Sequence, residues 1–153
     1  MEIERKFLVN KAMWEQLARF DADSIRQGYI ADNNGTSIRV RTTNTKAWLN
    51  IKKLVSPTER FEFEYAIPLE DAMDMFTHLV QNELSKTRYR IEHAGNLWEV
   101  DVFEGKNEGL IVAEIELPDA DTAFEKPAWI AGEVTHDFRY LNTNLATQPY
   151  TTW

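Results

Sequence analysis

Apolar and polar residues alternate along most of this chain, and a period of two predicts β-strands. The first nine residues, MEIERKFLV, are an example, because successive side chains of a strand point to opposite faces. Glu2, Glu4 and Lys6 share one face of this predicted strand. Ile3 and Phe7 lie on the opposite face. One face is therefore charged and the other is apolar.

The pattern predicts an α+β chain of about eight antiparallel strands with helices inserted between them. Apolar residues at helical spacing indicate helices, and residues that tolerate a left-handed backbone indicate a hairpin turn at 32–35. The two segments on either side of 93–96 are also predicted to pair as a hairpin. With no linker or repeat, we expect a single domain over residues 1–153, whose sheet is long enough to curl or close. The predicted strands are 1–9, 24–32, 36–43, 46–55, 59–68, 84–95, 96–105 and 109–118; the predicted helices are 11–20, 69–82, a short piece after 119 and a stretch near 141–147.

Composition excludes several kinds of function. The 153 residues include no cysteine, which rules out disulfides, thiol nucleophiles and cysteine-ligated metals. No apolar run approaches the roughly 18 residues of a membrane span, so we expect a cytoplasmic protein without a membrane partner. The formal net charge of −8 argues against nucleic acid as a partner. The three histidines are too scattered to suggest a metal cluster.

The charged faces of the predicted strands are unusual when they are compared. A solvent-facing sheet surface is normally a mixture of small polar and charged residues, whereas these faces are almost wholly ionic and rich in arginine. The first and last strands are acidic, and some strands between them are purely basic. The residues are Glu2, Glu4, Lys6, Arg39, Arg41, Lys52, Arg60, Glu62, Glu64, Lys86, Arg88, Arg90, Glu99, Asp101, Glu114 and Glu116.

If the sheet closes with this face inward, an acidic cluster lies beside a basic one in its lumen. Converging carboxylates are best neutralised by a hard divalent cation, Mg²⁺ or Mn²⁺. Several Arg and Lys residues in the same cavity favour a polyanion such as a polyphosphate. The alternative is that these groups form ion-pair ladders between neighbouring strands. For Arg60 and Arg90, at strand ends, ion pairing is the better interpretation.

Several motifs resemble those of the CYTH superfamily, the triphosphate tunnel metalloenzymes. Its E-x-E-x-K signature matches residues 2–6, and similar segments follow in order across practically the whole chain. The resemblance implies a closed eight-stranded antiparallel β-barrel, a tunnel with the helices packed outside. The further matching segments are QGYI (27–30), Arg39 and Arg41, NIKK around Lys52, RFEFE (60–64), KTRYR (86–90), EVDVF (99–103), Glu114 and Glu116, and GEVTHDFRY (132–140).

The resemblance also implies two sets of site residues, together with Mg²⁺ or Mn²⁺ as the cofactor. A metal cluster would consist of Glu2, Glu4, Glu114 and Glu116, with Asp101, Glu62 and Glu64 as direct or water-mediated ligands. A triphosphate cradle would consist of Lys6, Arg39, Arg41, Lys52, Lys86, Arg88 and Arg139.

Catalytic roles are implied for a few of these residues. Tyr29 and Lys52 are similar to a tyrosine–lysine pair that is catalytic in some members, and Lys86 is either catalytic or a charge contact. Tyr29 has an alternative role as a packed, hydrogen-bonded strand-end residue. The tail segment 132–140 is expected to form a lid near one tunnel mouth, and Arg139 reaches the substrate only if that segment folds inward.

The leading hypothesis is a metal-dependent triphosphatase that cleaves inorganic tripolyphosphate to pyrophosphate and phosphate. Trp48 and Trp98 are expected to pack in the core, so no feature announces a pocket for an organic ring. The alternatives are a class IV type adenylyl cyclase, a thiamine triphosphatase and, from a different class, a non-catalytic polyphosphate- or nucleotide-binding module. A homodimer is left open, and Trp129, Tyr150 and Trp153 could serve an interface or the core.

Overall fold

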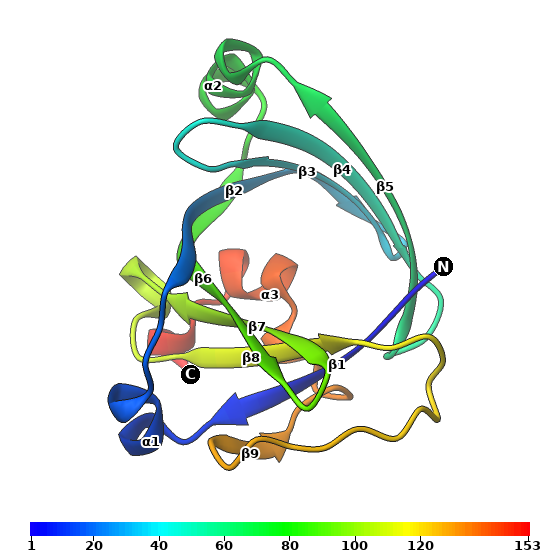
Figure 1. Cartoon of the computed structure of the whole chain (residues 1–153). Coiled ribbons are helices and arrows are strands. Elements are labelled where there is room, and N and C mark those ends of the chain that lie inside the picture. Colours follow the sequence, from blue (N-terminus) through cyan, green and yellow to red (C-terminus); the bar gives the residue numbers. More distant parts are fainter.

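The computed structural model describes residues 1–153 as nine strands, three α-helices and three short 3₁₀ helices (Figure 1). The strands are β1 (Glu2–Val9), β2 (Asp21–Asn33), β3 (Thr36–Thr42), β4 (Ala47–Leu54), β5 (Glu59–Ile67), β6 (Asn82–His93), β7 (Asn96–Phe103), β8 (Ile111–Glu116) and β9 (Ile130–Glu133). The helices are α1 (Lys11–Gln16), α2 (Leu69–His78) and α3 (Asn142–Thr147), with 3₁₀ helices η1 (Gly105–Asn107), η2 (Phe138–Tyr140) and η3 (Tyr150–Thr152).

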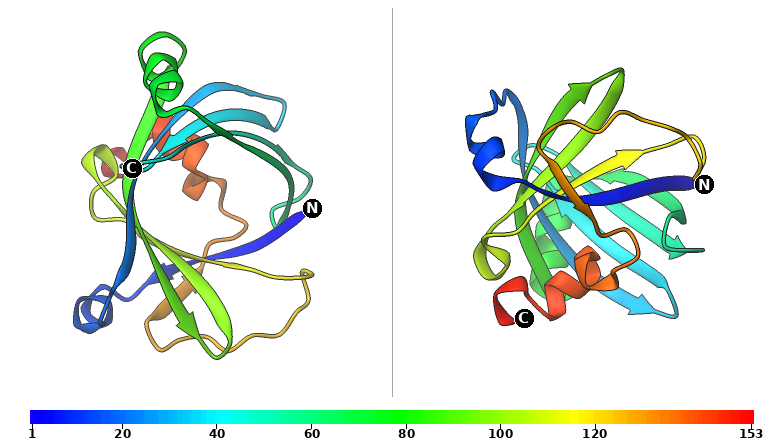
Figure 2. Two further views of the ribbon diagram at one scale, coloured as in Figure 1. Left: turned by 45° about the horizontal axis from the view of Figure 1, so that its top comes forward. Right: turned by 90° about the horizontal axis from the view of Figure 1, so that it is seen from below.

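Eight strands close into an antiparallel barrel, which confirms the predicted architecture. The strand order is β5-β4-β3-β2-β6-β7-β8-β1-β9, and β1 also pairs with β5 to complete the ring. This closing contact is short: only Glu2 opposite Arg60 and Ile3 opposite Glu59 are paired. The extra strand, β9, pairs with β1 outside the ring (Figure 2).

Both predicted hairpin turns form, and each has two consecutive residues with positive φ. Asn34 and Gly35 have φ values of 52° and 78°, and Ala94 and Gly95 have φ values of 50° and 79°. Two consecutive residues with positive φ give a turn whose twist matches that of the flanking strands. The β2–β3 and β6–β7 hairpins therefore fix the register of the strands that carry many of the inward-facing charges.

The largest apolar cluster lies outside the barrel wall formed by β1, β7 and β8. Phe7 and Trp98 are fully buried there, with their ring centroids 5.6 Å apart. Trp14 of α1 and Trp129 cover them from outside, and both also stack edge-on in this cluster. A smaller cluster joins the outer face of β3 and β4 to α2, through Phe76 and its neighbours.

A third apolar cluster fills one end of the barrel. Phe103 is paired directly with Lys86, and Val112 with Asp101, so these apolar side chains lie on the inner face. Leu145 of α3 is fully buried against them. Helix α3, near the orange-red end of the colour scale in Figures 1 and 2, therefore closes this end of the tunnel.

The apolar outer face of β5 is not covered by another element. Phe61, Phe63 and Tyr65 are 43%, 52% and 56% exposed. The only helix nearby, α2, packs on the outer faces of β3 and β4 instead.

Other differences from the prediction concern helix ends and the tail. The first helix ends at Gln16, and Phe20 is 93% exposed instead of packing. Residues 118–129 contain no helix, and β9 forms in a segment for which no strand was predicted. Trp129 belongs to the core, whereas Trp153 is largely exposed. None of the helices has the length and apolar character needed to cross a membrane.

We expect Trp98→Ala to lower the free energy of unfolding by about 3–5 kcal/mol, because it leaves a large cavity among packed aromatic rings. Urea unfolding followed by circular dichroism measures this change. Phe63→Ala is the matched control, since its half-exposed ring should cost well under half as much. Equal losses for the two variants would contradict this description of the core.

Candidate active site

The barrel encloses a polar cavity of about 620 Å³. Only four of its 24 lining residues are hydrophobic, whereas eight are acidic and seven are basic. The lumen is therefore nearly balanced in charge, although the whole chain has a formal charge of −8. A site that binds only a cation would not need so many basic residues. The basic groups of this cavity can also bind an anion.

Most of the predicted site residues meet in this cavity. Thirteen of the fifteen line it, and Asp101 and Arg139 are the two that do not. None of the three histidines lines the cavity. The thirteen are Glu2, Glu4, Lys6, Tyr29, Arg39, Arg41, Lys52, Glu62, Glu64, Lys86, Arg88, Glu114 and Glu116.

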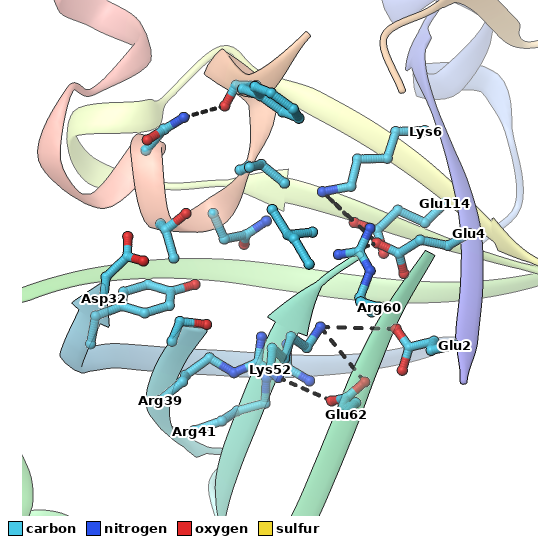
Figure 3. Close-up of a pocket in the computed structure, with 18 of the residues that line it drawn as sticks. Glu2, Glu4, Lys6, Asp32, Arg39, Arg41, Lys52, Arg60, Glu62 and Glu114 are labelled. Carbon is cyan, nitrogen blue, oxygen red and sulfur yellow. Dashed lines mark hydrogen bonds and ion pairs between the residues drawn. The ribbon is translucent and has the colours of Figure 1, made fainter. Parts of the chain in front are cut away.

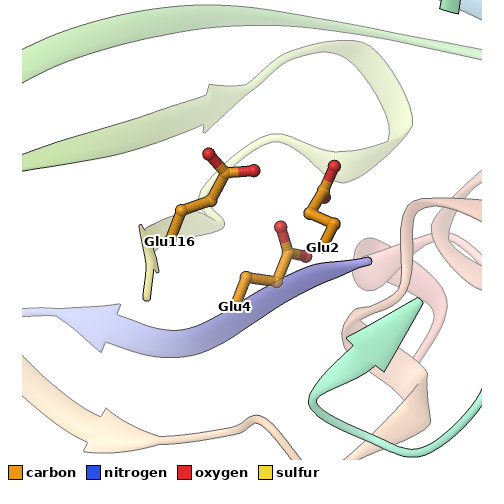
Figure 4. Close-up of side chains that lie close together, drawn as sticks. All are labelled: Glu2, Glu4 and Glu116. Atoms are coloured by element: carbon orange, nitrogen blue, oxygen red, sulfur yellow. The ribbon is translucent and has the colours of Figure 1, made fainter. Parts of the chain in front are cut away.

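Three carboxylates converge in the arrangement that a metal ion requires. One oxygen atom each from Glu2, Glu4 and Glu116 lies within 4.8 Å of the other two (Figure 4). The strand register produces this contact, because Glu4 of β1 is paired directly with Glu116 of β8. Like charges in directly opposed positions are destabilising unless something neutralises them. An oxygen-binding divalent cation fits this donor set.

Burial and neighbouring carboxylates shift the pKa values in this cluster. Burial, followed by a hydrogen bond with Glu62, raises the pKa of Glu2 to about 9. Burial and nearby Glu99 and Glu4 also raise the pKa of Glu116. For Glu62, burial opposes the shift, but the hydrogen bond with Glu2 and the charges of Lys52 and Arg39 lower its pKa to about 2. The Glu2–Glu62 pair therefore retains one proton at a pH where two separate carboxyls would have lost both.

The fourth predicted ligand, Glu114, lies on the basic side of the cluster. Its carboxylate is 3.6 Å from the Lys6 ammonium and 4.0 Å from the Arg88 guanidinium. Burial opposes the shift, but these two cations lower the pKa of Glu114 to about 2. In Figure 3, Glu114 and Glu4 lie next to each other, near the Lys6 ammonium. Glu114 is thus already neutralised by protein side chains.

The Asp101 carboxylate is likewise paired with cationic side chains. Its carboxylate accepts hydrogen bonds from Lys86 Nζ at 2.7 Å and from Arg88 Nε and Nη2 at 2.7 and 2.9 Å. It is 1% exposed and does not line the cavity. This bidentate contact orients the Arg88 guanidinium. The arrangement supports a positioning role for Asp101 rather than the predicted metal-ligand role.

Several cations have more donors than partners. Arg39 is buried at the cavity wall, and its Nε and Nη2 atoms have no hydrogen-bond acceptor. Its only carboxylate neighbour is Glu62, 3.6 Å away. Burial and the nearby charges of Arg39 and Arg88 lower the pKa of Arg41 to about 9. Buried donors without acceptors are costly, so this wall is suited to an anion with many oxygen atoms.

The two lysines predicted to be catalytic lie in different surroundings. Lys52 is 3.9 Å from Glu2 and 3.7 Å from Glu62, and burial and Arg39 lower its pKa to about 8 (Figure 3). Lys86 is fully buried, and burial lowers its pKa to about 7 even though Asp101 opposes the shift. Burial is the main cause of both lowered pKa values, but Lys86 differs from Lys52 in having a close carboxylate partner, Asp101 at 2.7 Å.

Tyr29 is linked to Lys86 rather than to Lys52. Its hydroxyl accepts a hydrogen bond from Gln27 Nε2 at 2.9 Å, and no hydrogen bond joins it to Lys52. The same Gln27 nitrogen donates to Asn142 Oδ1, which also accepts from Lys86. Burial raises the pKa of Tyr29, so the hydroxyl keeps its proton. The predicted Tyr29–Lys52 pair is thus not a contact in the structure.

The tail closes the cavity, but not with Arg139. Asn142 and Phe138 line it, whereas Arg139 is turned outward and pairs with Asp137 at 2.6 Å. Trp98 packs in the core as expected. Trp48 does not: it is paired with Arg41 and so lies on the inner face, half-buried and outside the apolar clusters.

Sequence reasoning missed several groups of this site. Arg60 forms the expected ion pair, 3.1 Å from Glu4, but it also lines the cavity. Arg90, the other arginine for which ion pairing was predicted, pairs with Asp21 and Asp23 only. Gln27 and Asn142 were not singled out, because an uncharged amide in a strand or helix gives no signal by itself.

The family model for the CYTH domain matches residues 1–150. The chain belongs to the CYTH family. Membership of this family agrees with the closed barrel and its inward-facing charges. It confirms the resemblance that the sequence motifs indicated.

Two curated relatives and one crystal structure are similar to this CYTH chain. An inorganic triphosphatase of Acetivibrio thermocellus is 45% identical, over 97% of this chain and 95% of the relative. An inorganic triphosphatase of Nitrosomonas europaea is 34% identical, over 95% and 96%. The crystal structure of the inorganic triphosphatase NE1496 has a TM-score of 0.67 and 32% identity, over 95% of this chain and 97% of that one.

We expect the stability difference between Glu2→Gln and the wild-type CYTH domain to depend on pH in the presence of a chelator. Between about pH 5 and about pH 7.5 the Glu2 carboxyl stays protonated in the folded protein but ionises in the unfolded chain. Wild type therefore loses stability with rising pH relative to the variant, and urea unfolding measures this loss. The Glu62 shift acts below this range.

Mn²⁺ should then stabilise the wild type more than Glu2→Gln, because the variant has lost one ligand. Glu70→Gln, an exposed change on α2, is the control for charge removal and should behave like the wild type. A stability difference that is constant with pH would contradict the raised pKa of Glu2.

Proposed function

We propose that this CYTH protein is a Mg²⁺- or Mn²⁺-dependent triphosphatase that hydrolyses inorganic tripolyphosphate to pyrophosphate and phosphate. The observation that carries the proposal is that a carboxylate triad and a set of under-neutralised cations line one cavity. A metal alone would leave the cations unsatisfied, and a polyphosphate alone would be repelled by the carboxylates. Both requirements are met by a triphosphate together with a divalent metal. The names of the two curated relatives support this choice.

Glu2, Glu4 and Glu116 would hold the metal, with Glu62 beside them through its hydrogen bond to Glu2. The bound metal would supply positive charge to phosphate oxygens and lower the pKa of a bound water. Glu64 accepts a hydrogen bond from Asn50 at 2.7 Å and lines the same wall, so it is available through water. Glu114 and Asp101 are assigned to orienting cations instead.

The cations would bind the phosphate chain along the opposite wall. Arg39 has free donors, and Arg41 and Lys52 have lowered pKa values because they are buried near other cations. A bound polyanion removes this cause, so binding restores their charge and is favoured by it. Lys6 and Arg88 complete the cradle from β1 and β6. Arg139 is left out of it, because its side chain points away.

Lys86 and Tyr29 are the groups suited to act at the transferred phosphate. Phosphoryl transfer depends mainly on positioning and on neutralising the charge of the transferring group. The fully buried Lys86 ammonium supplies such a charge at a fixed place. Tyr29 keeps its proton and can donate it as a hydrogen bond to a phosphate oxygen or to the attacking water.

The shape and lining of the cavity favour a small inorganic substrate. Its hydrophobic lining residues are Tyr29, Leu54, Phe138 and Leu141, too few to enclose an organic ring in the way that ligand pockets usually do. No observation in the cavity favours the adenylyl cyclase or thiamine triphosphatase alternatives over tripolyphosphate. The assay below separates them.

Phosphate release from tripolyphosphate should require Mg²⁺ or Mn²⁺ and stop with a chelator. Glu4→Gln should reduce kcat/KM by more than about 100-fold, because it removes a ligand from the triad while leaving a side chain of the same size. Colorimetric detection of phosphate measures the rates, and the exposed Glu70→Gln is the matched control.

ATP and thiamine triphosphate are assayed in parallel. Faster release from either would move the assignment to that substrate, and cyclic AMP from ATP would establish the cyclase. Tight tripolyphosphate binding in calorimetry without any product would support the binding module and overturn the hydrolase.

A further inference from the structure

The tail contributes a polar side chain to the interior of the barrel. Asn142, the first residue of α3, accepts two hydrogen bonds at Oδ1: from Lys86 Nζ at 2.8 Å and from Gln27 Nε2 at 3.1 Å. Gln27 is fully buried and continues the network, because its Oε1 accepts from Arg41 Nε at 3.1 Å. A single amide of the tail thus meets β2 and β6 at the phosphate-facing wall.

This contact determines where the Lys86 ammonium lies. An ammonium group has three N–H donors, and two of them are used by Asp101 Oδ2 at 2.7 Å and by Asn142 Oδ1. Since Lys86 also lines the cavity, its third donor is available to a ligand. A lysine side chain is long and flexible, so acceptors on two separate elements are needed to fix its end.

Asn142 has no structural duty within its own helix. The N-cap of α3 is Leu141, which makes no side-chain capping bond. Neighbouring polar residues differ in this respect: Asn144 donates to the Phe138 carbonyl, and Thr147 bonds to carbonyls of its own helix. The fully buried Leu145 gives the helix a second contact with the barrel.

We propose that Asn142 is a positioning residue that holds the Lys86 ammonium in its catalytic place, an inference that rests on the proposed triphosphatase function. Asp101 pulls the ammonium toward the barrel wall, and Asn142 fixes it from the side of the tail. The same oxygen holds Gln27, which in turn donates to the Tyr29 hydroxyl. Loss of Asn142 therefore disturbs both groups assigned to the transferred phosphate.

A double-mutant cycle tests this role with tripolyphosphate and Mg²⁺. Asn142→Ala should reduce kcat about 10- to 100-fold and change KM much less, because the transition state depends on the ammonium position. In a Lys86→Met background the same change should have little further effect. Thr147→Ala, an exposed change in the same helix, is the control and should match the wild type. Equal fold-losses in both backgrounds, or a fully active Asn142→Ala, would overturn the proposal.

A second measurement does not depend on activity. Hydrogen–deuterium exchange of the amides in residues 142–147 should become several-fold faster in Lys86→Met, because the tail loses its partner in the barrel. Unchanged exchange would overturn the coupling even if Lys86→Met is too inactive for the cycle. If the wild type is inactive but exchange is faster in Lys86→Met, the proposed function is overturned. The contact between Asn142 and Lys86 would still be supported.

Discussion

The structure depends on enclosing charge inside a protein. Moving a charged side chain out of water costs several kcal/mol unless a partner compensates for it, and fifteen acidic or basic residues line this one cavity. Protein partners satisfy some of them fully, as in the contact of Asp101 with Lys86 and Arg88. Others remain under-compensated: two donor atoms of Arg39 have no acceptor, and Glu116, which lies opposite Glu4, forms no ion pair. The pattern of compensated and uncompensated charges distinguishes the scaffold of the tunnel from the positions open to ligands.

Apolar packing outside the barrel offsets the free-energy cost of burying these charged side chains. The largest apolar cluster lies between the outer wall and the segments that cover it, with Trp98 at its centre. Since strand residues alternate between faces, Glu2 and Lys6 of β1 are each followed by an apolar residue, Ile3 and Phe7, that packs outward. One strand therefore supplies both cavity-lining charges and part of the core.

Much of this arrangement could be predicted from the alternation of residues. The shared face of Glu2, Glu4 and Lys6 follows from the period of two, and the positive φ values of the first hairpin turn follow from Asn34-Gly35. The pairing of charges could not be predicted. Whether Glu114 faces a metal or Lys6 depends on register and tilt, which no local pattern contains. The exposure of the outer face of β5 could not be predicted either, because it depends on where α2 packs.

The open edge of β5 gives the inward-facing glutamates of this strand a second effect. Beyond Arg60, the strand is paired with β4 alone, so the backbone from 61 to 67 has a free edge with aromatic side chains on its outer face. Open edges of this kind invite pairing with another chain, and natural proteins discourage it with charged side chains that point inward. Glu62 and Glu64 are such residues. The same inward carboxylates that line the cavity therefore also make this open edge less favourable for the addition of another strand.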